Sequence, residues 1–126
     1  MINAIIILSV LCSSVAQIAL KKGMLQCDCS FSPEVSNILP LISALVLNPF
    51  LVAGVFLHIA ALFTWLYVLK HVEVSYAYPF ISMGFVVVLL LSYYLFNENI
   101  NAYRIVGVSL IILGIILVGK SSAPVS

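Results

Sequence analysis

Charged side chains are scarce in this chain, which has five Lys or Arg and four Asp or Glu among 126 residues. They make up 7% of the sequence, whereas a soluble globular domain carries about 25%. Hydrophobic residues reach 64%, against the usual fraction of about 45–50%. The net charge of +1 is too small to indicate a nucleic-acid partner. This composition excludes a soluble enzyme and indicates a protein that works in or across a bilayer.

Four apolar runs with almost no charge account for most of the chain, at residues 2–20, 50–69, 76–96 and 103–119. A helix over each run would be about 26–31 Å long, which matches the ~30 Å hydrocarbon core of a membrane. The predicted fold class is therefore an all-α membrane protein with four transmembrane helices. The connections leave no room for a separate soluble domain, so residues 1–126 are predicted to form one domain. The first run lacks a basic segment before it, so we expect a retained span rather than a signal peptide.

The first connection differs from the two tight ones that follow it. Ser32-Pro33-Glu34 is a helix-start signal, with a capping serine, a proline at the first helical position and an acid in the first turn. The helix predicted after it, over residues 35–47, is too short to span the bilayer. We therefore expect an interfacial or partly re-entrant helix, ended by Asn48-Pro49.

Acidic residues are missing from the interior of all four runs. Asp28 and Glu34 fall in the first connection, and Glu73 and Glu98 fall in the two short ones. A proton-coupled exporter of cations needs a buried carboxylate that exchanges its proton for the substrate. His58 is the only other group inside a run that titrates near neutral pH. Cys27 and Cys29 lack a second ligand pair, so no metal is predicted, and no nucleotide or redox cofactor motif is present.

Polar side chains inside the runs predict a substrate groove, because such groups face protein or a water-filled cavity. Ser9, Ser13, Gln17 and Lys21 recur every four residues and form one stripe. Lys21 or Lys22 would attract an anionic head group at its rim. The remaining candidates for the groove come from the second and third runs: His58, Trp65, Tyr78 and Ser82.

Structural roles remain open for each of these groups. The serines and Gln17 could hydrogen-bond between helices, and the lysines could extend toward the interface. His58 could be a hydrogen-bonded structural residue, and the tyrosines could belong to an interfacial aromatic belt.

The last run predicts an association surface. Gly107 and Gly114 lie seven residues apart on one helical face, with Ile111 between them. Small residues on one face let two helices approach closely.

Membrane orientation is not decided by positive charge. With a cytoplasmic N-terminus, Lys70 and Lys120 would lie inside, and Lys21, Lys22 and Arg104 outside. Dual insertion in antiparallel dimers and a single weakly preferred orientation therefore both stay open.

The chain resembles the EamA-like group of the drug/metabolite transporter superfamily. The resemblance rests on Ala19-Leu20-Lys21-Lys22-Gly23, Ala77-Tyr78-Pro79, Asn97-Glu98-Asn99-Ile100 and the pair Gly107 and Gly114. In size it is most similar to the four-helix members, the small multidrug resistance proteins and the aminoarabinose-phosphoundecaprenol flippase subunits. These resemblances imply a transporter of a bacterial inner membrane, and a homodimer or heterodimer, because four helices make half of the usual transport unit.

The small multidrug resistance proteins and the flippase subunits differ at positions where this sequence can be compared with both. Small multidrug resistance proteins carry an essential glutamate where this chain has Ser13, and Ala-Tyr-Ala-Ile-Trp where it has Ala77-Tyr78-Pro79-Phe80-Ile81. The long first connection and Gln17 look more like the flippase type. The resemblance thus implies translocation of a lipid-linked sugar, a polyprenyl-phosphate glycolipid. A small-solute or cationic-drug exporter that uses His58, and an accessory subunit without transport of its own, are the alternatives.

Overall fold

The structure is a computed structural model that describes residues 1–27 and 38–121. Over these residues the chain forms six α-helices and no strand: α1 (Ile2–Gln26), α2 (Ile38–Leu47), α3 (Pro49–His71), α4 (Val74–Ile81), α5 (Met83–Phe96) and α6 (Ala102–Lys120). Three of them, α1, α3 and α6, are each long and apolar enough to cross a membrane, and α4 with α5 makes a fourth such segment. The predicted all-α fold with four spans is therefore confirmed.

Helix α2 occupies the position predicted for a short interfacial helix. It is apolar, has no buried residue and is too short to span. The helix-start signal at residues 32–34 and the predicted first turn at 35–37 lie outside the described residues. At its other end Asn48 separates α2 from α3, and its side-chain oxygen accepts from the Phe50 amide at 2.9 Å. The same side chain donates to the Gly23 carbonyl at 3.2 Å, which ties the start of α3 to α1.

The third predicted span, residues 76–96, is divided at Ser82 into α4 and α5. Pro79 lies inside α4 and has no amide hydrogen, so the helical hydrogen bond expected at this position cannot form. Three residues later the Ser82 hydroxyl donates to the Pro79 carbonyl. The span predicted as one run is therefore two helices, with a short break at Ser82.

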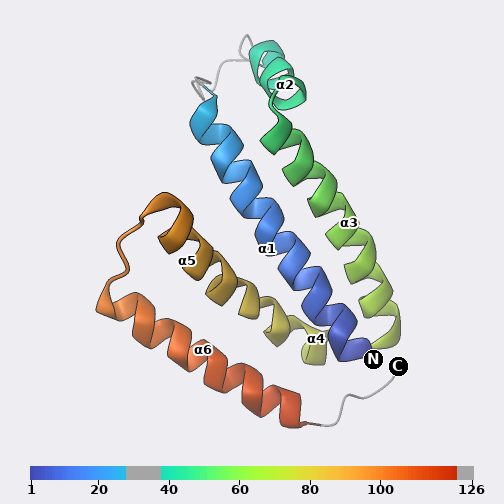
Figure 1. The fold of residues 1–126 in the computed structure, drawn as a ribbon. Coiled ribbons are helices and arrows are strands. Elements are labelled where there is room, and N and C mark those ends of the chain that lie inside the picture. The colour runs from blue at the N-terminus through green and yellow to red at the C-terminus, as the bar shows by residue number, and fades with distance from the viewer. Residues whose placement is uncertain (28–37, 122–126) are drawn as a thin grey trace.

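Helices α1 and α3 run antiparallel side by side and form the closest pair in the molecule (Figure 1). Two glycines allow this approach. A Cβ added at Gly54 would lie 2.7 Å from the Leu20 side chain and 3.0 Å from the Ala16 carbonyl oxygen, and one at Gly23 would lie 2.6 Å from Leu51. The absence of a side chain at these positions therefore sets the distance between the helices.

Helices α5 and α6 form a hairpin that meets this pair from one side (Figure 1). Helix α5 contacts α1, whereas α6 contacts only α4 and α5 among the described residues. The largest buried cluster joins α1, α3 and α4 near the start of α1; it comprises Ile6, Val68, Val72, Tyr76, Ala77 and Phe80. This cluster therefore fixes α4, and the contact of α5 with α1 continues the attachment of the third span to the helix pair.

We expect Gly54→Ala to destabilise the protein. The alanine gains about 1 kcal/mol of helix propensity, but overpacking against the Ala16 backbone costs about 1–3 kcal/mol. Gly119→Ala is the matched control, because its Cβ would meet only Phe80 at 3.8 Å, an ordinary contact. The unfolding midpoint in mixed dodecyl maltoside and SDS, followed by circular dichroism, should fall for Gly54→Ala only. Equal midpoints would show that α1 and α3 can separate without cost.

Candidate functional site

A cavity of about 330 Å³ lies between the α1–α3 pair and the α4–α5 break. The middle of α1 and the adjacent part of α3 form one side of the cavity. Ile81, Gly84 and Phe85 of the third span form the other side. Its lining residues are Ser9, Val10, Ser13, Ser14, Gln17, His58, Ala61, Leu62, Trp65, Ile81, Gly84 and Phe85. The structure thus brings together four of the predicted substrate-binding residues: Ser13, Gln17, His58 and Trp65.

Three of these lining residues carry unpaired polar groups that can both donate and accept hydrogen bonds. Ser13, Gln17 and His58 have no hydrogen-bond partner among the described residues. Among those residues no buried polar side-chain atom is left unsatisfied, so the three side chains keep their polar groups accessible instead of burying them. An amide, a hydroxyl and an imidazole can donate to and accept from the hydroxyl groups of a sugar.

Two other serines of the same wall have structural partners. The Ser9 hydroxyl donates to the Ala61 carbonyl at 3.0 Å and so links α1 to α3. The Ser14 hydroxyl donates to the Val10 carbonyl at 2.8 Å within α1. Both serines are buried. Of the stripe predicted from the sequence, Ser9 therefore has a structural role, whereas Ser13 and Gln17 are unpaired among the described residues.

The two candidates from the third span do not line the cavity. Tyr78 is 58% exposed, and its ring meets Trp65 edge to face with centroids 6.2 Å apart. Tyr78 therefore contacts the lining residue Trp65 without lining the cavity itself. Ser82 uses its hydroxyl at the helix break, where it bonds to Pro79. Their predicted contact with substrate would need a rearrangement of the third span.

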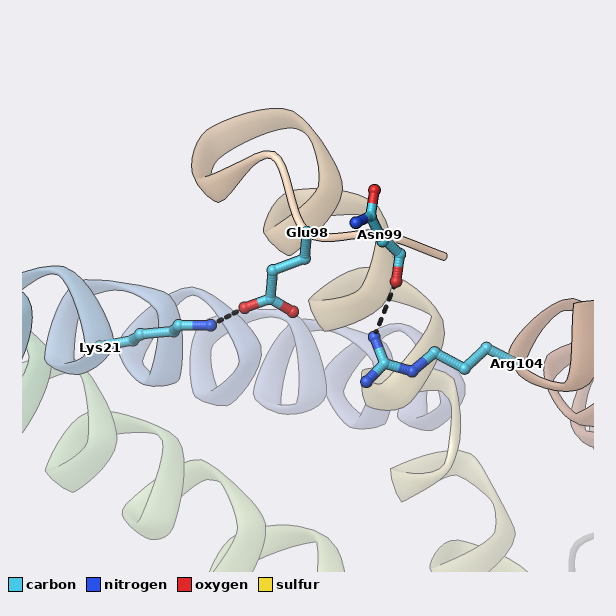
Figure 2. A network of polar contacts seen from close by, with 4 residues as sticks. All are labelled: Lys21, Glu98, Asn99 and Arg104. Atoms are coloured by element: carbon cyan, nitrogen blue, oxygen red, sulfur yellow. Dashed lines mark hydrogen bonds and ion pairs between the residues drawn. The ribbon is translucent and has the colours of Figure 1, made fainter. Parts of the chain in front are cut away.

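The two lysines at the end of the stripe have different surroundings. Lys21 forms an ion pair with Glu98, which follows α5, and its ammonium lies 4.7 Å from the centre of the Phe96 ring. Figure 2 shows this pair reaching from α1 to the α5–α6 connection. The Lys22 ammonium lies 4.5 Å from the centre of the Phe50 ring on α3. Neither lysine lines the cavity, but Lys21 follows Gln17 by one turn, about 6 Å along the helix axis.

The sequence offered no signal for the apolar part of the lining. Leu62, Ile81 and Phe85 belong to runs in which almost every residue is apolar. Gly84 is different, because a Cβ there would lie 3.1 Å from the Ser14 hydroxyl. A glycine in an apolar run is visible in the sequence, but the sequence does not show that Gly84 packs against α1.

The described residues contain no group of three His, Cys, Asp or Glu that could hold a metal ion. No Asp or Glu lines the cavity among the residues that the structure describes. Gly107 and Gly114 of α6 would meet nothing within 4 Å if a Cβ were added. These two glycines are therefore not covered by the chain's own described helices, whereas Ile111 is half-buried and Val118, on the same helical face, packs against the core cluster.

Four membrane-length helices, three of which line a cavity with unpaired polar groups, define a multi-pass membrane protein with a polar cavity between its helices. The sequence comparisons agree with this class. The model of the EamA-like transporter family matches residues 1–120, and the chain belongs to that family. It is therefore a transporter-type membrane protein and not an enzyme, as predicted.

Several curated bacterial proteins are similar to the chain. It is 36% identical over 75 residues to the probable 4-amino-4-deoxy-L-arabinose-phosphoundecaprenol flippase subunit ArnE of Pseudomonas fluorescens (strain Pf0-1), covering 60% of this chain and 66% of that protein. It is 44% identical over 62 residues to the protein of the same name from Enterobacter sp. (strain 638), covering 49% and 58%. The matched segments thus span about half to two thirds of these relatives. With the four spans, they indicate a multi-pass protein of the bacterial inner membrane.

The cavity can be tested by cysteine labelling in a cysteine-free background. We expect Ser13→Cys to react with the hydrophilic reagent MTSEA at least about tenfold faster than Phe56→Cys, because a thiolate forms only where water reaches the sulfur. Phe56 is the matched position: it lies at similar depth on α3, between Gly54, which contacts Ala16, and Ala61, which contacts Ser9. It is 70% exposed but on an apolar surface. Equal rates would mean that the cavity is no more hydrated than the lipid-facing side.

Proposed function

We propose that this protein translocates a lipid-linked sugar, a polyprenyl-phosphate glycolipid, across the inner membrane. The observation that carries the proposal is the row of unpaired polar groups on the cavity wall, Ser13, Gln17 and His58. Hydrogen-bonding groups of this kind suit a sugar head group, whose hydroxyls must exchange water for other partners during the crossing. The similar proteins are named as probable subunits of a 4-amino-4-deoxy-L-arabinose-phosphoundecaprenol flippase, which supports the same substrate class.

The charge distribution favours this substrate over a cationic drug. The cavity is lined without Asp or Glu among the described residues, so no carboxylate is available there to exchange a proton for a cation. The nearest charged group along the α1 stripe is Lys21, a cation. An anionic phosphate at the rim and a sugar in the cavity fit this order of groups, while the prenyl tail stays in lipid.

The Gln17 side chain provides the direct test. We expect Gln17→Leu to reduce translocation about tenfold or more, because the amide's hydrogen bonds to the head group are lost at about 1–2 kcal/mol each. Flipping can be read in proteoliposomes as the fraction of polyprenyl-phosphate sugar that a sugar-modifying reagent reaches from outside.

Folding must be unchanged for the Gln17→Leu result to count. Gln17 is exposed and makes no hydrogen bond within the described chain, so the unfolding midpoint should stay at the wild-type value. Val15→Leu is a matched control on the same helix, since Val15 is 45% exposed and does not line the cavity. Full activity of Gln17→Leu would remove the proposed site.

We propose further that the protein acts as a dimer with a second four-helix subunit, identical or similar. The support is α6, which has no buried residue and carries Gly107, Ile111 and Gly114 along one face. A face of small and aliphatic residues lets a second helix approach closely in lipid. A pair of subunits would also cover the large apolar surface that the single chain leaves open.

Bulky residues on α6 test the dimer. We expect Gly107→Leu and Gly114→Leu to shift native mass spectra in mild detergent from dimer to monomer. Each Cβ meets open space within the chain, so the unfolding midpoint of the monomer should not fall. Leu117→Phe is a control on the same helix, because Leu117 is already large and 70% exposed. A dimer that persists in both glycine variants would place the interface elsewhere.

A further inference from the structure

The end of the cavity stripe carries an ion pair between α1 and the connection that joins α5 to α6. Lys21 belongs to α1, and Glu98 follows Phe96, the last residue of α5. Their side chains are 40% and 33% exposed, so the pair is reachable from the aqueous boundary and is not sealed in the core. It lies one turn beyond Gln17, and therefore at the rim of the cavity.

The segment that carries Glu98 is held in a defined shape. Asn97 has a positive φ of 50°, in the left-handed region that ends α5. The Arg104 side chain donates to the Asn99 carbonyl at 3.4 Å, from the first turn of α6 (Figure 2). Glu98 is thus presented to Lys21 from a backbone segment that belongs to the α5–α6 hairpin, so the ion pair links that hairpin to α1.

The opposite end of the hairpin has the features of a pivot. Helix α4 is fixed in the buried cluster with α1 and α3, and the chain breaks at Ser82 before α5 begins. Helix breaks of this kind absorb changes in direction. Gly84 and Phe85, directly after the break, line the cavity. A swing of α5 about Ser82 would therefore change the cavity and separate Lys21 from Glu98 together.

We propose that the Lys21–Glu98 pair is the closed form of an exchangeable phosphate site: the phosphate of the substrate replaces the Glu98 carboxylate on Lys21 and so releases the α5–α6 hairpin from α1. This inference rests on the proposed function and adds a step to it. A carboxylate and a phosphate are both oxyanions that accept charge-assisted hydrogen bonds from an ammonium. The ammonium has three donors, but a carboxylate and a phosphate on the same lysine repel each other, so phosphate binding weakens the ion pair and thereby favours release of the hairpin.

The exchange is tested by a double-mutant cycle on phosphate binding. The probe is undecaprenyl phosphate, titrated into phosphatidylcholine nanodiscs that hold the protein and read by native mass spectrometry. We expect Glu98→Gln to bind about two- to fivefold tighter than wild type, because the ion pair no longer competes. Lys21→Gln should bind at least about tenfold weaker, and Lys21→Gln/Glu98→Gln should bind like Lys21→Gln.

A matched control separates competition from overall charge. Glu73→Gln makes the same change of charge at the other face of the membrane, where Glu73 precedes α4 and makes no side-chain capping bond. Its affinity for undecaprenyl phosphate should equal that of wild type. Tighter binding by Glu98→Gln that persists without Lys21, or that Glu73→Gln reproduces, would overturn the exchange.

A second lipid identifies the source of the phosphate. Phosphatidylglycerol at the same mole fraction offers a phosphate diester without the polyprenyl chain. We expect it to show neither the affinity nor the Lys21–Glu98 coupling, and equal coupling would assign the site to bulk anionic lipid and overturn the link to substrate. Absence of undecaprenyl phosphate binding in every variant would overturn the proposed function together with the exchange. Binding by wild type without coupling would overturn the exchange alone.

Release of the hairpin has its own readout. Spin labels at Leu25→Cys on α1 and Tyr103→Cys on α6, both exposed positions, are placed in a cysteine-free protein diluted with unlabelled chains. We expect undecaprenyl phosphate to lengthen the distance distribution in double electron–electron resonance, and Glu98→Gln to show the longer distance without lipid. Identical distributions in all of these samples would show that the ion pair does not hold the hairpin.

Discussion

The close contact between α1 and α3 is the interaction on which the other features depend. Apolar side chains give helices no preference for one another over lipid, so association in a membrane requires surfaces that fit closely. Here the fit comes from Gly54 against Ala16 and Leu20, and from Gly23 against Leu51. The Ser9–Ala61 and Asn48–Gly23 hydrogen bonds fix the position of α3 along the axis of α1. The resulting helix pair presents Ser13, Gln17 and His58 toward the same cavity.

The second part of the molecule is attached to this pair in a different way. Helices α5 and α6 follow a helix break at Ser82, and α6 touches only α4 and α5 within the described chain. At the far end the connection to α1 includes an accessible ion pair, which contributes little to stability in such surroundings. The helix pair and the third span form the two sides of the cavity, and α6 is attached to them only through that span among the described residues.

Much of the site could be predicted from helical spacing. A separation of four residues places Ser9, Ser13, Gln17 and Lys21 on one face of α1 wherever the helix packs. The four-residue spacing did not distinguish Ser9, which bonds to Ala61, from Ser13, which has no described partner, because that difference depends on which neighbour lies opposite. Tyr78 and Ser82 were expected at the groove because they are polar groups of the third run. In the structure Ile81, Gly84 and Phe85 of that span line the cavity instead, because the side of the span that faces α1 is decided by packing.

The sequence by itself determined the class of protein, since apolar runs of bilayer length with so few charges have no stable alternative to spanning helices. It also determined the positions of polar groups along each helix, because helical spacing is a local property. Only the tertiary structure decided that Lys21 is paired with Glu98, residues that lie far apart in the chain. Ion pairs, cavities and close helix contacts depend on which surfaces meet, and in an apolar chain the pattern of hydrophobic residues carries almost no information about that choice.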